Sequence, residues 1–155
     1  MMTVIALVAA YFGILALLFA IANPHRARLK ELAADLVADY PDDDLARLFC
    51  TNYLRTAYSW RAAPIRFLAY MIALMIPGPK LEQECIEMER EHAFMADSRV
   101  RELIESYHAS IAAVNPLFGA LLYFAKLLIR LKAFVNHRGK MKAHEAVYVG
   151  LRGYA

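Results

Sequence analysis

The chain has 155 residues, of which 60% are hydrophobic, and a formal net charge of +3. This is the length of one domain, and the hydrophobic share exceeds the 45–50% that is usual for soluble domains. Only two cysteines are present, Cys50 and Cys85, and they lie far apart, so no disulfide framework is implied.

The first predicted element is a transmembrane helix over residues 3–22. No charged side chain occurs before residue 24, and residues 3–22 are almost wholly apolar. At about 1.5 Å per residue they form a helix of roughly 30 Å, the thickness of a bilayer's hydrocarbon core. A cleaved signal peptide ending at Ala20-Ile21-Ala22 is the alternative, but no Lys or Arg precedes the apolar stretch, which is also unusually long for one. We therefore expect a retained N-terminal anchor.

Small residues form a stripe along this helix. They recur at spacings of three and four, which places them on one face: Ala6, Ala9, Gly13, Ala16 and Ala20. In lipid, helices associate largely through close packing, and small residues let two backbones approach each other. The stripe is therefore a predicted helix-packing face. This face is expected to pack either against another subunit or against the last predicted span. The last span has a similar surface of small residues: Ala112, Ala113, Gly119 and Ala120.

Residues 24–61 are expected on the cytoplasmic or matrix side. Asn23-Pro24 is expected to end the first helix, and the basic residues that follow are typical of the inner face of a membrane: His25, Arg26, Arg28 and Lys30. Apolar residues at helical spacing then predict an amphipathic surface helix that ends at Tyr40. The aspartates after Pro41 suit the N-terminus of a further helix, about 44–61. Its aromatic residues favour the level of the lipid headgroups: Tyr53, Tyr58 and Trp60.

Two further spans are predicted, over residues 62–79 and 109–126. The uninterrupted apolar part of the first is short, so that crossing requires Arg66 to extend its side chain to the interface. A re-entrant segment or a buried helix is the alternative for this range. The second is apolar from 109 to 125, although it contains Asn115-Pro116.

The distribution of charge predicts the orientation of these spans. Residues 80–108 are rich in acidic side chains, whereas residues 127–155 carry no acid before Glu145. Because positive charge marks the inner side, the N-terminus is expected outside, residues 80–108 outside, and the C-terminus inside. The membrane is expected to be a bacterial or mitochondrial inner membrane. The predicted fold is all-α, a single membrane domain over 1–155 with about three transmembrane helices and amphipathic helices on both sides.

The basic segment after the last predicted span is a candidate site for lipid headgroups. Positive side chains beside a membrane attract anionic lipids by roughly 1 kcal/mol per charge. Cardiolipin or phosphatidylglycerol would suit such a site; the alternative is that these residues only set the orientation. Nucleic acid is not an expected partner, because the basic run lies at a membrane surface. The residues are Lys126, Arg130, Lys132, Arg138, Lys140 and Lys142.

Two Glu-x-x-His units are the main candidates for metal chemistry. They are Glu89 with His92 and Glu105 with His108. Residues at i and i+3 share a helix face, and carboxylate-bridged di-iron proteins use this unit twice. A di-iron site also needs two carboxylates from other helices, and the glutamates outside this segment map to the opposite side of the predicted membrane. We therefore expect no cofactor and interpret the four side chains as part of a solvated charged face.

These features favour a non-catalytic integral membrane subunit, an accessory, structural or assembly component of a larger inner-membrane complex. Its expected partners are anionic membrane lipids and other membrane subunits. A pore-forming protein is the alternative: three spans with an outer N-terminus and a basic inner tail are similar to the layout of class I phage holins. That resemblance covers topology and overall charge. A di-iron carboxylate membrane enzyme is the remaining alternative.

Overall fold

The computed structural model describes residues 2–135, including their side chains except at positions 2, 78–82, 85 and 133–135. This part of the chain contains helices and no strands, which confirms the all-α prediction. The elements are α1 (Met2–Asp39), α2 (Asp44–Thr56), α3 (Ala62–Met75), α4 (Gly78–Glu91), a short 3-10 helix η1 (Ala93–Ala96), α5 (Ser98–Val114) and α6 (Pro116–Val135).

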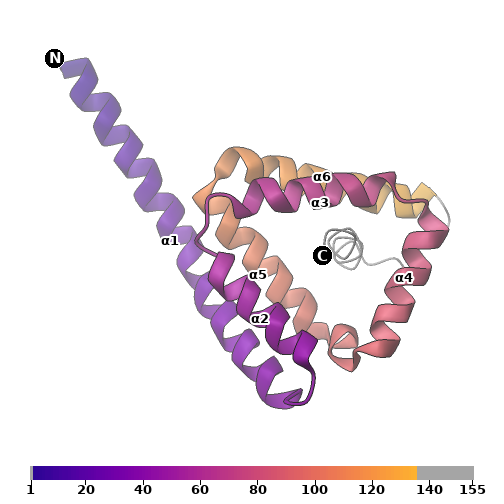
Figure 1. The fold of residues 1–155 in the computed structure, drawn as a ribbon. Helices are drawn as coiled ribbons and strands as arrows, with labels where there is room; N and C mark the ends of the chain where they lie inside the picture. Colours follow the sequence, from indigo (N-terminus) through magenta and orange to yellow (C-terminus); the bar gives the residue numbers. More distant parts are fainter. Residues whose placement is uncertain (1, 136–155) are drawn as a thin grey trace.

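The helices are arranged along the edges of a triangle (Figure 1). The second half of α1 lies beside α2 and α5 along one edge, α3 lies beside α6 along another, and α4 forms the third. The first half of α1 projects beyond the corner at which the first two edges meet. The molecule therefore consists of a helical body and one projecting helix that is continuous with it.

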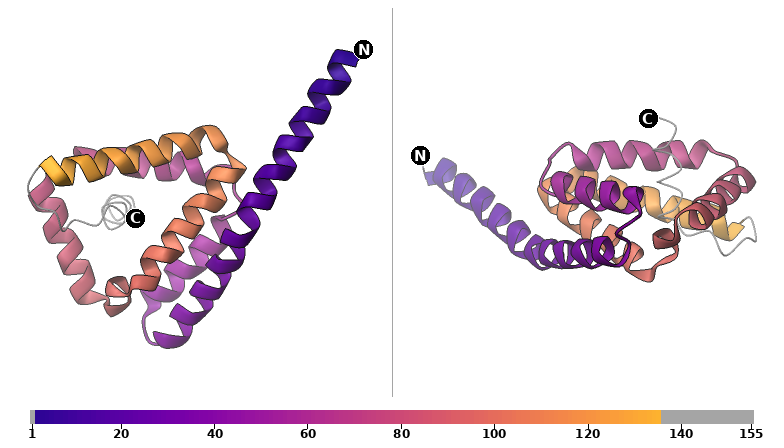
Figure 2. Two further views of the ribbon diagram at one scale, coloured as in Figure 1. Left: turned by 180° about the vertical axis from the view of Figure 1, so that it is seen from behind. Right: turned by 60° about the horizontal axis from the view of Figure 1, so that its bottom comes forward.

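The helix α1 runs without interruption through Asn23-Pro24, so the predicted break at this position is wrong. A proline inside a helix removes one backbone hydrogen bond and bends the helix, but packing on either side can maintain it. The two halves of α1 do differ in direction (Figure 2, right). The second half is held by a buried apolar stripe at helical spacing: Leu29, Leu32, Ala33 and Leu36.

The core of the body lies where α1, α2 and α5 meet. Aromatic rings run through it, with centroid distances of 4.3 Å between Phe49 and Tyr53 and 4.4 Å between Tyr53 and Tyr107. Phe94 of η1 is 0% exposed, and its ring centroid lies 5.7 Å from that of Phe49. Such aromatic pairs bury large apolar areas. The short helix η1 thus ties the end of α4 to the core of the body.

These contacts do not fit the predicted placement of residues 24–61 and 80–108 on opposite sides of a membrane. The second half of α1 packs along α5, and Phe94 is buried against Phe49 of α2. A bilayer cannot pass between side chains in contact, so both segments lie on one side of any membrane that the first half of α1 crosses. Charge counted along the sequence does not reveal these contacts, because acidic residues of one segment pair with basic residues of the other, as in Arg28 with Glu102.

Three spans are likewise not confirmed. Among the described residues, α1 is the one helix that is long and apolar enough to cross a bilayer. The helix α3 has 14 residues, about 21 Å at 1.5 Å per residue. The range 109–126 is divided between α5 and α6, because Asn115 leaves the helical conformation with φ −136° and ψ 82°. The residue before a proline is disfavoured in the α region, and here the chain turns.

Candidate membrane-interface site

The first half of α1 presents apolar side chains on all its sides. Val4, Leu7, Phe12 and Leu17 are each more than half exposed, and the neighbouring positions are similar. Exposed apolar surface of this extent is unfavourable in water and marks a site of contact with lipid or protein. This helix is compatible with association with a membrane.

The predicted helix-packing stripe lies on this projecting half. All five of its residues are exposed: Ala6, Ala9, Gly13, Ala16 and Ala20. A Cβ atom added at Gly13 would have nothing within 4 Å. The expected packing against the last span does not occur, since Gly119 instead packs against Ala112 across the bend between α5 and α6. The stripe is therefore uncovered, and its docking to another subunit stays a prediction.

A buried arginine marks the point at which the apolar half of α1 ends. Arg26 is 4% exposed, and its Nε donates a hydrogen bond to Ser110 Oγ at 3.1 Å. The Ser110 hydroxyl in turn donates to the carbonyl of Ala57 at 2.9 Å. The Arg26 guanidinium lies 4.6 Å from the ring centre of Phe19 and 4.5 Å from that of Tyr58, a cation–π arrangement on both. One side chain thus joins α1, α5 and the connection between α2 and α3.

Exposed aromatic residues from the connection between α2 and α3 lie at the same corner. Tyr58 and Trp60 are at least half exposed, and the Arg61 guanidinium lies 5.4 Å from the Trp60 ring centre. The Asn115 amide donates to the carbonyl of Trp60 at 3.1 Å, which attaches the start of α6 to the start of α3. Aromatic rings with a polar tip, flanked by cations, are typical of the membrane–water interface. Tyr53, expected at the same level, is instead buried in the core.

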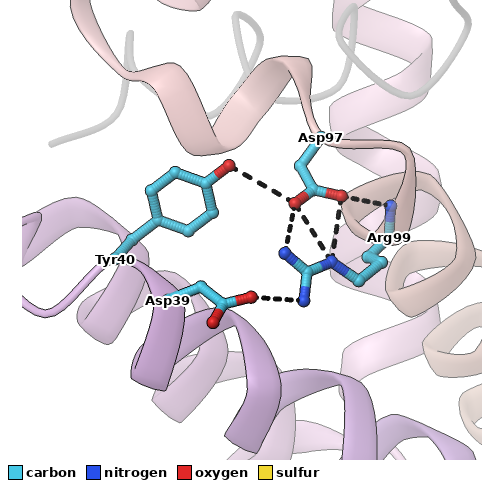
Figure 3. Close-up of polar contacts among 4 residues, drawn as sticks. All are labelled: Asp39, Tyr40, Asp97 and Arg99. Carbon is cyan, nitrogen blue, oxygen red and sulfur yellow. Dashed lines mark hydrogen bonds and ion pairs between the residues drawn. The ribbon is translucent and has the colours of Figure 1, made fainter.

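A polar cluster at the far end of α1 fixes its second half to α5 (Figure 3). Asp97 caps α5 by accepting a hydrogen bond from the backbone N–H of Arg99 at 2.8 Å. The Arg99 guanidinium pairs with Asp97 at 2.6 Å and with Asp39 at 2.7 Å. The Tyr40 hydroxyl donates to Asp97 at 3.3 Å. These bonds hold the end of α1 against the start of α5.

The cluster predicts a loss of stability in acid. Hydrogen bonding by the Arg99 side chain lowers the pKa of Asp97 below its ordinary value of 3.8. The stabilisation is therefore complete above that value and disappears as the pH falls through the lower pKa of the folded state. We expect the free energy of unfolding to fall below about pH 4, and to fall less in Asp97→Asn, which keeps the cap but not the charge.

Chemical denaturation in detergent between pH 7 and pH 3 measures this effect. Asp97→Ala, which also removes the cap, is expected to cost about 1 kcal/mol at pH 7. The matched control is Asp42→Asn, because Asp42 is exposed in the turn after α1. An Asp97→Asn variant with the same pH profile as Asp42→Asn would contradict the assigned role.

The residues of the two Glu-x-x-His units have other partners. His92 Nδ1 lies 3.2 Å from a carboxylate oxygen of Asp43. Glu105 accepts a hydrogen bond from Lys126 at 2.6 Å, and Lys126 lies 3.5 Å from His108 Nδ1. The structure places the first unit, Glu89 and His92, at the end of α4 and the second in the middle of α5. In the described part of the chain, no three His, Cys, Asp or Glu side chains form a group that could hold a metal ion.

The predicted headgroup site is only partly available. The Lys126 side chain is 6% exposed and paired with Glu105, so it cannot reach a lipid headgroup. Lys132 donates to the carbonyls of Leu74 and Ile76 and thereby satisfies the C-terminal end of α3. Arg130 is 57% exposed, 3.8 Å from Glu105, and faces solvent. The remaining members of the predicted site, Arg138, Lys140 and Lys142, lie outside the described residues.

Comparisons with known protein families, curated proteins and solved structures find no match for this chain. The class of protein is therefore defined by the fold, and by the way in which the apolar half of α1 joins the body. It is an all-helical body from which one long apolar helix projects, and a helix of this kind is compatible with a membrane anchor.

Proposed function

We propose that the protein is a non-catalytic, membrane-anchored accessory subunit of a larger inner-membrane protein complex. One observation carries this proposal: the exposed apolar half of α1 and the half buried in the body belong to a single helix. A flexible linker would leave the body free to tumble. A continuous helix, clamped by Arg26 where it enters the body, instead holds the body at a defined position beside the membrane.

The basic residues after the apolar half support an inner-side location for the whole described body. Lys and Arg directly after a span mark the cytoplasmic or matrix side, and His25, Arg26, Arg28 and Lys30 stand at that position. The N-terminus would then be outside. A holin-like pore is not proposed, because that layout needs residues 80–108 outside.

The buried polar groups of the body support a structural role. The Arg66 guanidinium lies 4.4 Å from the ring centre of Tyr53 and 5.2 Å from that of Tyr107. Lys126 is occupied by Glu105. Each of these cations is engaged with neighbouring helices and so stabilises their packing, a role that requires no substrate.

Charges in the projecting helix test the anchor. Leu7 and Ile14 are exposed, so Leu7→Arg/Ile14→Arg leaves the core of the body intact. Each arginine near the centre of a membrane helix costs about 2.5–3.5 kcal/mol. The unchanged protein is expected to resist alkaline carbonate extraction from bacterial membranes, whereas the double variant is released. Leu48→Arg, at an exposed site on α2, is the control; a double variant that stays in the membrane with it would contradict the anchor.

The small-residue stripe tests the association with partners. Gly13→Leu places a large side chain in the stripe, where nothing lies within 4 Å of the added Cβ atom. Solubilised from its native membrane in mild detergent, the unchanged protein is expected to migrate with larger partners, and Gly13→Leu to be released from them. A stable monomer that is indifferent to this change would remove the accessory-subunit proposal while leaving the anchor in place.

A further inference from the structure

A second apolar surface lies along the edge of the body formed by α3 and α6. The two helices run side by side in the same direction (Figure 1). Their starts are joined by the bond from Asn115 to Trp60, and their ends by the bonds from Lys132 to Leu74 and Ile76. We call this pair of helices the arm. Its contact side is buried and is made of Ala69, Tyr70, Ala73, Leu122, Ala125 and Ile129.

Each helix of the arm also has an exposed apolar face. On α3, Ile65, Leu68 and Met75 are more than half exposed, at spacings that keep them on one helix face. On α6 the corresponding residues are Leu117, Phe124, Leu127 and Leu131, all at least half exposed. No acidic residue occurs in 62–79 or 116–135, and Arg130 contributes an exposed positive charge. This surface is therefore compatible with contact to both acyl chains and anionic headgroups.

The position of the arm indicates what covers it. Both of its helices begin at the corner from which the apolar half of α1 leaves the body, beside the exposed rings of Tyr58 and Trp60. If that half crosses a bilayer, the corner lies at the membrane surface. The arm would then begin at the membrane surface, where the anchor enters the body. Leaving these exposed apolar side chains in water would be unfavourable.

We propose that the arm is a second membrane contact, which lies along the inner leaflet with its apolar side in the boundary between headgroups and acyl chains. This inference rests on the proposed anchoring by α1. With 14 residues, α3 is too short to cross a bilayer, but a helix that lies in the interface has no such length requirement. Arg130, near the end of α6 and 57% exposed, would reach phosphate groups more easily in this position than across the membrane. Two contacts instead of one fix the rotation of the body about the anchor.

Tryptophan fluorescence tests the arm directly, because Trp60 is the only tryptophan of the chain. In a Trp60→Phe background, a single tryptophan is introduced at one of three exposed sites: Phe12→Trp in the anchor, Leu127→Trp in the arm, or Leu48→Trp on α2. The full-length proteins are reconstituted into phosphatidylcholine/phosphatidylglycerol vesicles with or without brominated acyl chains. We expect the bromolipid to quench Phe12→Trp and Leu127→Trp at least twofold more than Leu48→Trp. Phe124→Trp provides a second reporter on the same face of α6.

The outcomes separate the arm from the anchor. Quenching of Phe12→Trp without quenching of Leu127→Trp and Phe124→Trp would overturn the membrane-contacting arm and leave the anchor standing. A blue-shifted but unquenched tryptophan in the arm would also overturn it, because it would show that protein covers this face. Absence of quenching at Phe12→Trp would overturn the proposed anchoring itself.

Discussion

Replacing Gly119 by leucine is expected to force α5 and α6 apart and to destabilise the body by about 3 kcal/mol or more. A Cβ atom at this position would lie 2.6 Å from the Cβ atom of Ala112 and 2.7 Å from its Cα atom. Because the obstacle includes backbone, a change of rotamer cannot relieve the clash. A loss of this size is a large fraction of the 5–15 kcal/mol that stabilises a typical domain.

Urea denaturation followed by far-ultraviolet circular dichroism in detergent measures this loss. Gly13→Leu is the matched control, since it makes the same chemical change at a helical position with open space around the Cβ atom. The control is expected to unfold with the unchanged protein, although it loses partners. Equal denaturation midpoints for both variants would show that the close approach of α5 and α6 at Gly119 contributes nothing.

Phe94→Ala is expected to cost about 3–5 kcal/mol, the usual range for removing a buried phenylalanine side chain. Phe94 is 0% exposed, and its ring contacts Phe49 of α2 and Tyr40 after α1, with centroid distances of 5.7 Å and 6.3 Å. The substitution leaves a cavity between segments that are more than 40 residues apart in the sequence. It also tests the arrangement of the body, because a Phe94 in a loop on the outer side of a membrane would contribute little.

The control for this cavity is Phe124→Ala, which removes the same side chain from an exposed position on α6. In detergent we expect it to change the free energy of unfolding by less than about 0.5 kcal/mol. Similar small effects for both variants would contradict the packing of η1 into the core and would restore the possibility that residues 80–108 lie on the outer side.

Local signals in the sequence predicted the helices well. The aspartates after Pro41 were expected to begin a helix, and Asp43 does accept hydrogen bonds from the backbone N–H groups of Leu45 and Ala46. Asp97, an aspartate directly before a helix, likewise caps α5. The exposed apolar half of α1 was evident from the absence of charge. Each of these features depends on neighbouring residues, so the sequence alone carries the information.

The side of a membrane on which each segment lies could not be predicted from neighbouring residues. Basic residues after the first helix and acidic residues in 80–108 suggested two sides of a membrane, because charge bias is ordinarily a record of orientation. In the structure, opposite charges of the two segments form ion pairs with each other, as in the pairs of Arg28 with Glu102 and Arg99 with Asp39. Pairing between distant residues and separation by a membrane leave the same charge pattern in a sequence, and only the packing distinguishes them.

Two Asn-Pro dipeptides show the division between sequence and tertiary structure most clearly. The sequence by itself determined an all-helical chain, an apolar N-terminal helix and the sites at which proline weakens a helix. It could not determine that α1 continues through Asn23-Pro24, where packing on α5 holds the next turns, while the chain bends at Asn115-Pro116. There the close approach of Gly119 to Ala112 and the bond from Asn115 to Trp60 stabilise the bend. A proline leaves bent and broken helices close in energy, so contacts with distant residues decide between them.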